Sequence, residues 1–216
     1  MPHQAIRETS DQRVDRFAAL YPEQAGVFAH DLARHPLLAL GALADAAEAL
    51  DPAHVEVRHG DRGAGGDFAH VDAATPVSDI IRNIANQRCW VMLRGLEQLP
   101  AYAALLADTL GEYRAIAQAQ TGAMHDPRAF IFISSMDMVT PFHCDPEYNI
   151  LFQIAGDKCF RTYPAEPPFL TAYAHEALHA AGANLLCWED GFADAGTPHL
   201  LSPGDALFVP YKRRTM

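Results

Sequence analysis

The sequence lacks the features that mark secreted, membrane-spanning and nucleic-acid-binding proteins. Its amino-terminal stretch MPHQAIRETSDQRVDRF is polar and contains no apolar signal core. No apolar run reaches the roughly 20 residues that a transmembrane helix needs. The 16 basic residues are outnumbered by 27 acidic ones, giving a formal net charge of -11, which argues against the basic surface that nucleic acids and anionic membranes require. We therefore expect a cytoplasmic protein with no nucleic-acid partner and no membrane association.

Cysteine is scarce, and its spacing excludes two further kinds of site. The four cysteines, Cys89, Cys144, Cys159 and Cys187, form no CxxC pair, so neither a zinc ribbon nor a thioredoxin-like redox site is indicated. We expect all four to be thiols packed as small hydrophobic side chains. The sequence has no internal repeat and no long low-complexity linker. Half of its 216 residues are apolar, which is enough for a hydrophobic core.

Helical patterns dominate the first half of the chain and strand patterns dominate the second. In the first half, the patterns predict four helices, at residues 11–20, 36–50, 76–86 and 100–120. They also predict two strands, at residues 54–59 and 89–96. The second half predicts strands in AFIFISS, NILFQIA, KCFRTYP, LLS and ALFVP, and a helix at residues 172–181. Strands joined by hairpins favour antiparallel sheets. The predicted fold class is therefore α+β, a sandwich or barrel with helices packed outside.

The stretch TPFHCDPEYNILFQIAGDKCF, residues 140–160, carries polar side chains within an apolar strand pattern. His143 and Asp145 are two residues apart, so they share one face of an extended strand. Gly156-Asp157 predicts a two-residue hairpin loop between NILFQIA and KCFRTYP. Pairing across that loop places Lys158 on the same face as the histidine, because cross-strand partners project from one face of a sheet.

This set of side chains suits one kind of metal chemistry. An imidazole and a carboxylate on one face are two thirds of the 2-His-1-carboxylate triad, which binds non-haem Fe(II) and leaves positions open for a cosubstrate and O₂. The ammonium of Lys158 can bind the far carboxylate of a dicarboxylic cosubstrate as a point charge. Asn149 shares the face if the first strand continues past Pro146. Each residue alone has an ordinary explanation; a lysine after a turn, for example, is usually solvent-exposed. Their combination on one face is what indicates a metal and cosubstrate site.

Residues 140–160 also resemble the metal-binding strands of JmjC-type, cupin-fold 2-oxoglutarate oxygenases, the asparaginyl-hydroxylase branch in particular. The shared pattern is a TPxHxD start, an asparagine four residues after the aspartate and a QIxGxK turn, at Thr140, Pro141, His143, Asp145, Asn149, Gln153, Ile154, Gly156 and Lys158. The resemblance implies an incomplete double-stranded β-helix, or jelly-roll, in residues 121–216. Residues 1–120 would be a helical region with a few strands, packed on it within one structural domain. This first half is similar to small bacterial cupin-like proteins often labelled transcriptional regulators.

The resemblance also implies roles for individual residues. His143 and Asp145 would bind Fe(II), Lys158 and Thr140 would hold the 5-carboxylate of 2-oxoglutarate, and Asn149 would line the pocket. The implied function is that of an Fe(II)- and 2-oxoglutarate-dependent dioxygenase, hydroxylating a small molecule or a protein side chain. Assembly into a homodimer is left open.

The chain departs from that family at the third metal ligand. In the family a distal histidine follows a hairpin like PGDALFVP at a fixed interval, which counted from Pro203 ends on Thr215. The strands that close the barrel are missing as well, so we expect a truncated or frameshifted form with impaired activity. Translation of the codons for KRRT in a shifted reading frame could place a histidine at the position of Thr215. The remaining candidates are poor substitutes for the ligand: His125, His175, His179 and His199.

Two other functions stay open. A non-catalytic cupin-like binding or transcriptional-regulatory module is favoured by the missing ligand. A metal-binding cupin that does not use 2-oxoglutarate is disfavoured, because it leaves Lys158 without a role. Binding and decarboxylation of 2-oxoglutarate would separate these functions.

Overall fold

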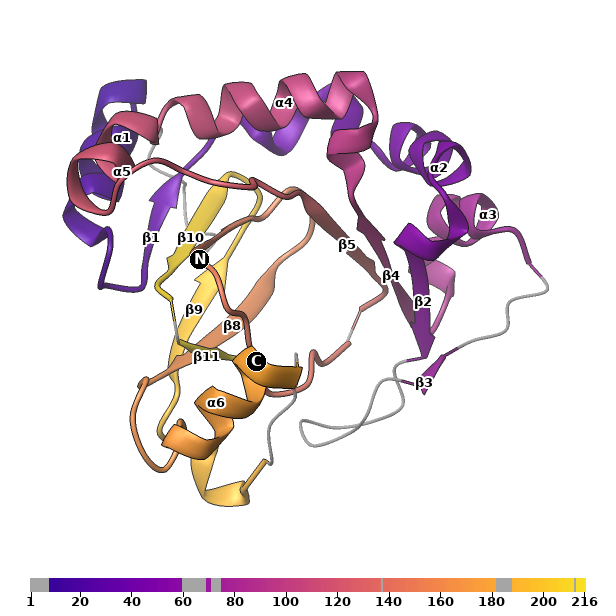
Figure 1. Ribbon diagram of the computed structural model, residues 1–216. Helices are drawn as coiled ribbons and strands as arrows, with labels where there is room; N and C mark the ends of the chain where they lie inside the picture. Colours follow the sequence, from indigo (N-terminus) through magenta and orange to yellow (C-terminus); the bar gives the residue numbers. More distant parts are fainter. Residues whose placement is uncertain (1–7, 60–68, 71–74, 137, 182–187, 212) are drawn as a thin grey trace, which may run out of the picture. The chain divides into compact units, whose positions relative to one another are not determined.

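The computed structural model describes residues 8–59, 69–70, 75–136, 138–181, 188–211 and 213–216. Backbone contacts divide the chain into two compact units (Figure 1). The first contains Met1–Ala33, Ala119–Thr121 and Pro141–Met216, and the second contains Arg34–Gln118 and Gly122–Thr140. Each unit therefore draws on both halves of the sequence. The division into domains 1–120 and 121–216 stays a prediction.

The first unit contains two antiparallel sheets, with strand orders β1-β10-β7 and β6-β11-β8-β9 (Figure 1). Its strands are β1 (Gly26–Ala29), β6 (His143–Cys144), β7 (Asn149–Phe152), β8 (Lys158–Tyr163), β9 (Thr197–Leu201), β10 (Asp205–Val209) and β11 (Arg214–Thr215). Its helices are α1 (Ser10–Leu20) and α6 (Ala172–Ala181), with short 3₁₀ turns at Leu32–Arg34 and Asp190–Phe192. We call the sheet β1-β10-β7 the β10 sheet and the sheet β6-β11-β8-β9 the β8 sheet. Helix α6 coincides with the predicted helix at residues 172–181.

The two sheets of the first unit share one hydrophobic cluster. Phe160 and Leu201 of the β8 sheet pack with Leu207 and Val209 of the β10 sheet, and all four side chains are buried. Because residues two apart along a strand share a face, this contact identifies the inner face of each sheet. The inner faces therefore meet in a sandwich-like packing of antiparallel sheets.

Helix α1 covers the outer face of the β10 sheet. The ring of Phe17, which is almost wholly buried, lies against the rings of Phe28 and Phe208. The helix begins one residue earlier than the predicted range 11–20, because Thr9 forms a capping box with Gln12. The apolar face of this short helix thus supplies the second layer on the sheet.

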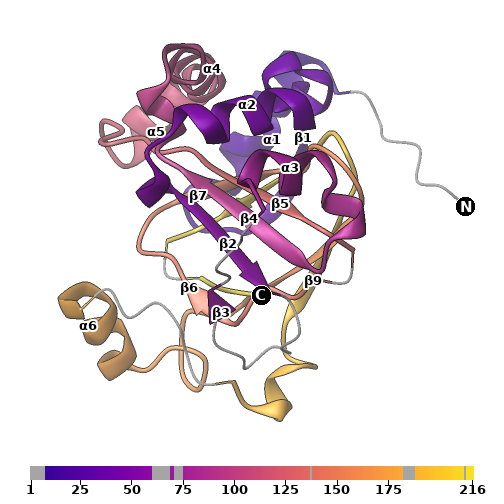
Figure 2. The same ribbon diagram turned by 90° about the vertical axis from the view of Figure 1, so that its right-hand side faces the viewer.

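The second unit contains one antiparallel sheet of order β3-β2-β4-β5 (Figure 2). Its strands are β2 (Val55–His59), β3 (Ala69–His70), β4 (Cys89–Arg94) and β5 (Phe130–Ser134). Its helices are α2 (Leu40–Ala49), α3 (Val77–Arg82), α4 (Pro100–Gly111) and all but the last two residues of α5 (Arg114–Gln120). Short 3₁₀ turns lie at Pro36–Leu38, Pro52–His54, Ile84–Asn86 and Leu96–Gln98. The long helix predicted at residues 100–120 is thus two helices.

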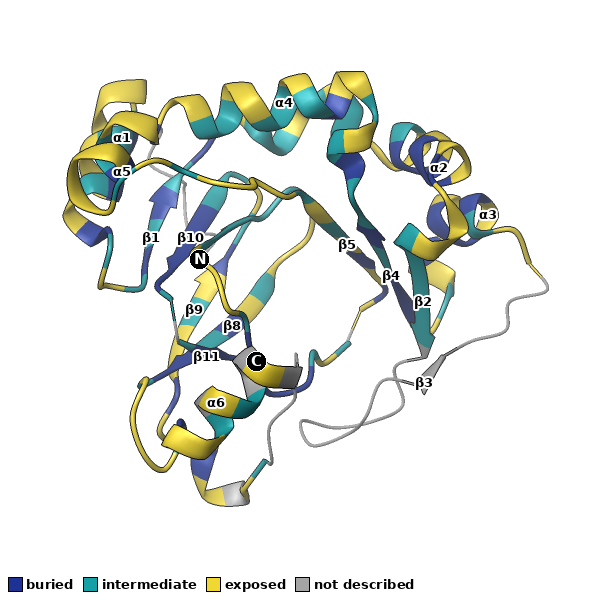
Figure 3. Cartoon of the chain, in the orientation of Figure 1, coloured by how far each residue is buried: buried dark blue, intermediate teal, exposed yellow. Residues whose placement is uncertain are grey.

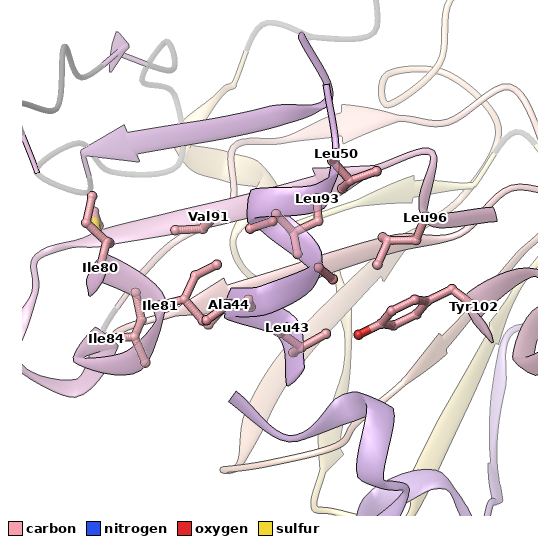
Figure 4. Close-up of a cluster of buried hydrophobic side chains, with 14 residues drawn as sticks. Leu43, Ala44, Leu50, Ile80, Ile81, Ile84, Val91, Leu93, Leu96 and Tyr102 are labelled. Atoms are coloured by element: carbon pink, nitrogen blue, oxygen red, sulfur yellow. The ribbon is translucent and has the colours of Figure 1, made fainter. Parts of the chain in front are cut away.

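The core of the second unit lies between its sheet and helices α2 and α3. Leu43 and Ala44 of α2, Ile81 of α3, and Val91 and Leu93 of β4 belong to one buried cluster (Figure 4). Figure 3 shows buried segments on α2, α3 and β4. The alanine-rich sequence of α2 allows this close packing, because its small side chains let the helix approach its neighbours.

The mixture of helices and antiparallel sheets confirms the predicted α+β class, but one predicted hairpin is wrong. Strand β7 pairs with β10, whereas β8 pairs with β11 and β9. The turn at Gly156 therefore passes from one sheet to the other. Gln153 stays with the β10 sheet, since its backbone exchanges hydrogen bonds with Asp205 and Gly204. A chain that leaves one sheet at this point cannot form the local hairpin.

Two further observations bear on the sequence predictions. Cys89 and Cys144 are buried thiols as expected, but Cys159 is exposed, and Cys187 lies outside the described residues. Cys159 is exposed because it projects from the outer face of β8, opposite Phe160. Among the described helices, none has the length and apolar character that crossing a membrane demands.

Candidate metal and cosubstrate site

The imidazole of His143 is oriented by its own chain. Its Nδ1 lies 2.8 Å from the carbonyl oxygen of Pro141. Since a carbonyl oxygen only accepts hydrogen bonds, Nδ1 carries the proton, and in the neutral ring Nε2 keeps a free lone pair. A metal-binding histidine is commonly fixed in this way, by a hydrogen bond from its other ring nitrogen.

Asp145 lies beside that free nitrogen. Its Oδ2 is 3.6 Å from Nε2 of His143, and it also accepts a 2.9 Å hydrogen bond from Nδ2 of Asn149. Strand β6 ends at Cys144, and the aspartate is the first residue after it. The predicted pair thus does converge, although Asp145 is placed by the turn after β6 rather than by strand alternation. The amide of Asn149 fixes the carboxylate.

Thr215 faces His143 across strands β11 and β6. The two residues are Cα partners, and the Thr215 hydroxyl oxygen lies 3.2 Å from Nε2 of His143. The hydroxyl therefore occupies the neighbourhood of the free lone pair. This is the position at which the family resemblance of residues 140–160 leads us to expect a distal histidine. Within the described part of the chain, no group of three His, Cys, Asp or Glu side chains could hold a metal ion.

Lys158 lies on the same face of the β8 sheet as His143. His143 pairs with Thr215, and Thr215 pairs with Thr162, so the three side chains project from one face. Lys158 is four residues before Thr162 on β8 and shares that face. The predicted juxtaposition is thus found, but with β11 between the two strands instead of across a hairpin.

The ammonium of Lys158 has no charged partner among the residues that the structure describes. It lies 5.9 Å from the centroid of the Phe160 ring, and no hydrogen bond or ion pair to it occurs among the described residues. Burial lowers the pKa of Lys158 because desolvation disfavours the charged form. A partly buried cation of this kind is stabilised by an anion that binds beside it.

Opposing effects act on His143. Burial lowers the pKa of its imidazole, but the Asp145 carboxylate, 3.6 Å from Nε2, stabilises the protonated ring and raises the pKa above its ordinary value. Lys158 is close enough for its positive charge to lower the pKa again. The charges of both Lys158 and Asp145 therefore act on the imidazole of His143.

The inner face carries a further polar pair that the sequence analysis did not assign. Nε2 of His199 lies 3.0 Å from the hydroxyl oxygen of Thr162. His199 is the Cα partner of Phe160, so it shares the face of Lys158. The alternation of TPHLL could have placed His199 in phase with the buried Leu201. The same register keeps it two strands away from Thr215, so it does not complete the metal site.

The other sequence candidates lie elsewhere. Thr140 is the last residue of the second unit, so its position relative to Lys158 is not described. His125 belongs to the second unit and is exposed. His175 and His179 lie on helix α6, and their side chains are outside the described set. The site therefore consists of side chains from β6 and the turn after it, and from β7, β8, β9 and β11.

The comparisons with known proteins concern the fold. No family model matches the chain, and no curated protein matches it. Among the solved structures, the chain is similar to the X-ray structure of E. coli ycfD, with a TM-score of 0.57 and 14% identity. The match covers 100% of this chain and 50% of that one, so the chain spans half the length of this neighbour. At this identity the likeness is one of fold alone.

Proposed function

We propose that the protein is a cupin-like member of the Fe(II)- and 2-oxoglutarate-dependent oxygenases, with a jelly-roll core formed by the sheets of the first unit. The observation that carries the proposal is the unpaired ammonium of Lys158 on the same inner sheet face as His143. A metal site alone does not need this cation, whereas a dicarboxylic cosubstrate does. The fold of the ycfD neighbour supports the architecture.

The side chains present fit a divalent metal ion at two positions. Nε2 of His143 and Oδ2 of Asp145 are 3.6 Å apart, and both can reach one ion, because metal–ligand bonds to such atoms are about 2.0–2.2 Å long. Both donors are already fixed, the imidazole by Pro141 and the carboxylate by Asn149. Fe(II) held there would supply the activation of O₂. Asn149 then positions the carboxylate, which is a more specific role than lining the pocket.

The side chains also fit a cosubstrate with a carboxylate at each end. Lys158 would form an ion pair with the 5-carboxylate of 2-oxoglutarate while the other end lies toward His143 and Asp145. Thr162 and His199 lie on the same face and offer a hydroxyl and a ring nitrogen. Thr140 as a second donor to the 5-carboxylate remains part of the proposal. The substrate class proposed is a small molecule or a protein side chain.

Calorimetry tests the two halves of this proposal separately. The protein should bind Fe(II) without oxygen, and the iron-loaded protein should bind 2-oxoglutarate. Lys158→Ala should weaken 2-oxoglutarate binding and leave iron binding nearly unchanged, while His143→Ala should remove iron binding. Asp157→Ala, an exposed carboxylate beside Lys158, and His125→Ala, an exposed histidine, are the matched controls. An iron-loaded protein that fails to bind 2-oxoglutarate would contradict the proposal.

A second candidate is a non-catalytic cupin-like binding or regulatory module. Thr215 favours it, because a hydroxyl stands where the family has a histidine and the described residues offer no third ligand. Decarboxylation of 2-oxoglutarate discriminates between the two. Turnover above that of His143→Ala supports the oxygenase, and binding without turnover supports the module. We expect slow turnover, since a site with two protein ligands holds iron weakly.

A further inference from the structure

The outer face of the β8 sheet contains a buried arginine without a counter-charge. The Arg214 side chain is 0% exposed. Its Nη1 and Nη2 have no hydrogen-bond partner in the described part of the chain, and its Nε makes one long hydrogen bond, 3.4 Å, to the carbonyl oxygen of Phe169. Along β11 the next residue is Thr215, so the arginine projects from the face opposite to His143. Four of the five guanidinium N–H groups are therefore unsatisfied.

This guanidinium remains charged near neutral pH. Burial lowers the pKa of Arg214 to about 10, well above the pH of a cell. A buried charge that lacks both water and a counter-ion is among the most destabilising features of a protein interior. The acidic residues Glu166, Glu189 and Asp194 are exposed. No carboxylate of the described residues forms an ion pair with Arg214, so a counter-charge must come from outside these residues.

Tyr163 supplies a second unsatisfied donor on the same face. It is the Cα partner of Arg214, and its hydroxyl is buried with no hydrogen-bond partner from any described residue. A Cβ added at Gly196 would lie 3.0 Å from this hydroxyl and 2.7 Å from the ring, so the glycine leaves room beside the tyrosine. The surrounding side chains are aromatic: Phe142, Phe169, Trp188 and Phe192. The two donor groups thus stand in an apolar enclosure that strengthens electrostatic interactions.

We propose that Arg214 and Tyr163 form a binding site for a small oxyanion, a carboxylate or phosphate group, separate from the site of His143. The planar fork of a guanidinium matches two oxygens of such a group, and the phenol offers one further donor. This inference does not depend on the proposed function, because the site lies on the other face of the β8 sheet. An anion bound there would satisfy both buried donors and hold strand β11 in place.

Thermal unfolding of the protein in phosphate and in acetate, each against sodium chloride at equal ionic strength, tests the site. The midpoint should rise with oxyanion concentration and then saturate, because a ligand that binds only the folded state stabilises it. Equilibration before each scan is needed, since the guanidinium has no exposed atoms. Arg214→Met should raise the midpoint in chloride and abolish the additional rise. A wild-type midpoint that responds equally to all three salts would overturn the proposal, as would an unchanged response in Arg214→Met.

Two further variants keep the test decisive if Arg214→Met does not fold. Tyr163→Phe retains the ring and removes one donor, so half-saturation should need about tenfold more oxyanion. Arg214→Lys keeps the positive charge but loses the planar guanidinium fork, so half-saturation should again need a higher oxyanion concentration than in the wild type. Arg128→Met removes an exposed arginine that pairs with Asp126 and should leave the response unchanged. Responses of Tyr163→Phe and Arg214→Lys identical to wild type would refute the site.

Discussion

At the scale of single residues, Thr215 decides how many protein ligands the proposed metal site contains. Its hydroxyl contacts Nε2 of His143 at 3.2 Å, so it stands beside the two candidate ligands and not merely near them in the fold. A neutral hydroxyl is a poor ligand for a divalent ion compared with an imidazole. The free protein instead uses it as a hydrogen-bond donor to the histidine. Replacing this one side chain should therefore change metal affinity directly.

Thr215→His should convert the pair of ligands into a 2-His-1-carboxylate set. We expect Fe(II) or Zn²⁺ to bind roughly a hundredfold more tightly. The binding free energy of a structural zinc site with four protein ligands is about 10–16 kcal/mol in total, and one added ligand contributes about a quarter of it. Calorimetry without oxygen measures the affinity. Thr197→His adds a histidine at an exposed position of β9 and is the control. If Thr215→His binds metal no better than Thr197→His, the assignment of His143 and Asp145 as ligands is wrong.

At the scale of elements, the turn at Gly156 determines where Lys158 points. It joins β7 of the β10 sheet to β8 of the β8 sheet. Gly156 has φ 68°, in the left-handed region, and the amide of Gln153 donates hydrogen bonds to the carbonyl oxygens of Ala155 and Gly156. The glycine is thus required by the backbone conformation, because no neighbouring atom restricts the space around it.

Gly156→Ala should destabilise the protein by about 1–2 kcal/mol, the cost of a left-handed conformation for a residue with a Cβ. Urea unfolding measures the change in the free energy of unfolding. Gly191→Ala is the matched control, since Gly191 is also surrounded by open space but has no positive φ. Equal stabilities of the two variants would show that the turn readily adopts another conformation.

At the scale of the whole molecule, His30 links distant segments of the first unit in a way that depends on pH. Its Nδ1 accepts a 2.9 Å hydrogen bond from the backbone of Leu32, so Nε2 carries the proton and donates to the carbonyl oxygen of Gln153 at 3.0 Å. Burial lowers the pKa of His30 from 6.5, although the charges of Asp205 and Asp31 partly oppose the shift. The folded state therefore holds a neutral imidazole.

The linkage between protonation and folding gives the sign of the pH dependence. Between the lowered pKa of the folded state and 6.5, the unfolded chain binds more protons at His30. Its contribution to stability is thus complete above 6.5 and decreases as the pH falls through the folded-state pKa. The raised pKa of His143 acts in the opposite sense, with a contribution that is lost as the pH rises.

His30→Gln separates these opposing contributions. Its free energy of unfolding, measured with urea from about pH 8 to about pH 5, should fall less steeply on acidification than that of the wild type. The glutamine can still hydrogen bond but does not titrate. His125→Gln, at an exposed histidine, should follow the wild-type curve. Parallel curves for His30→Gln and the wild type would contradict a neutral, buried His30.

Features that depend on neighbours along the chain were accessible from the sequence. Helices α1 and α6 follow from capping and apolar periodicity, and strands β4 and β8 from short apolar runs. His143 and Asp145 converge because only one residue separates them. The left-handed turn residue Gly156 was also predictable from its type, since glycine adopts this conformation without strain.

Contacts between residues far apart in the sequence required the folded structure. The pairing of β7 with β10 overrode the local hairpin, because long-range packing of two inner faces outweighs the preference of a two-residue turn. Thr215 reaches His143 across 72 positions of the chain, and Arg214 reaches its buried position because β11 pairs with both β6 and β8. Local periodicity specifies which residues alternate along a strand, but strand pairing decides which of them meet. The environments of Lys158, Thr215 and Arg214 were therefore set by partners that no local pattern identifies.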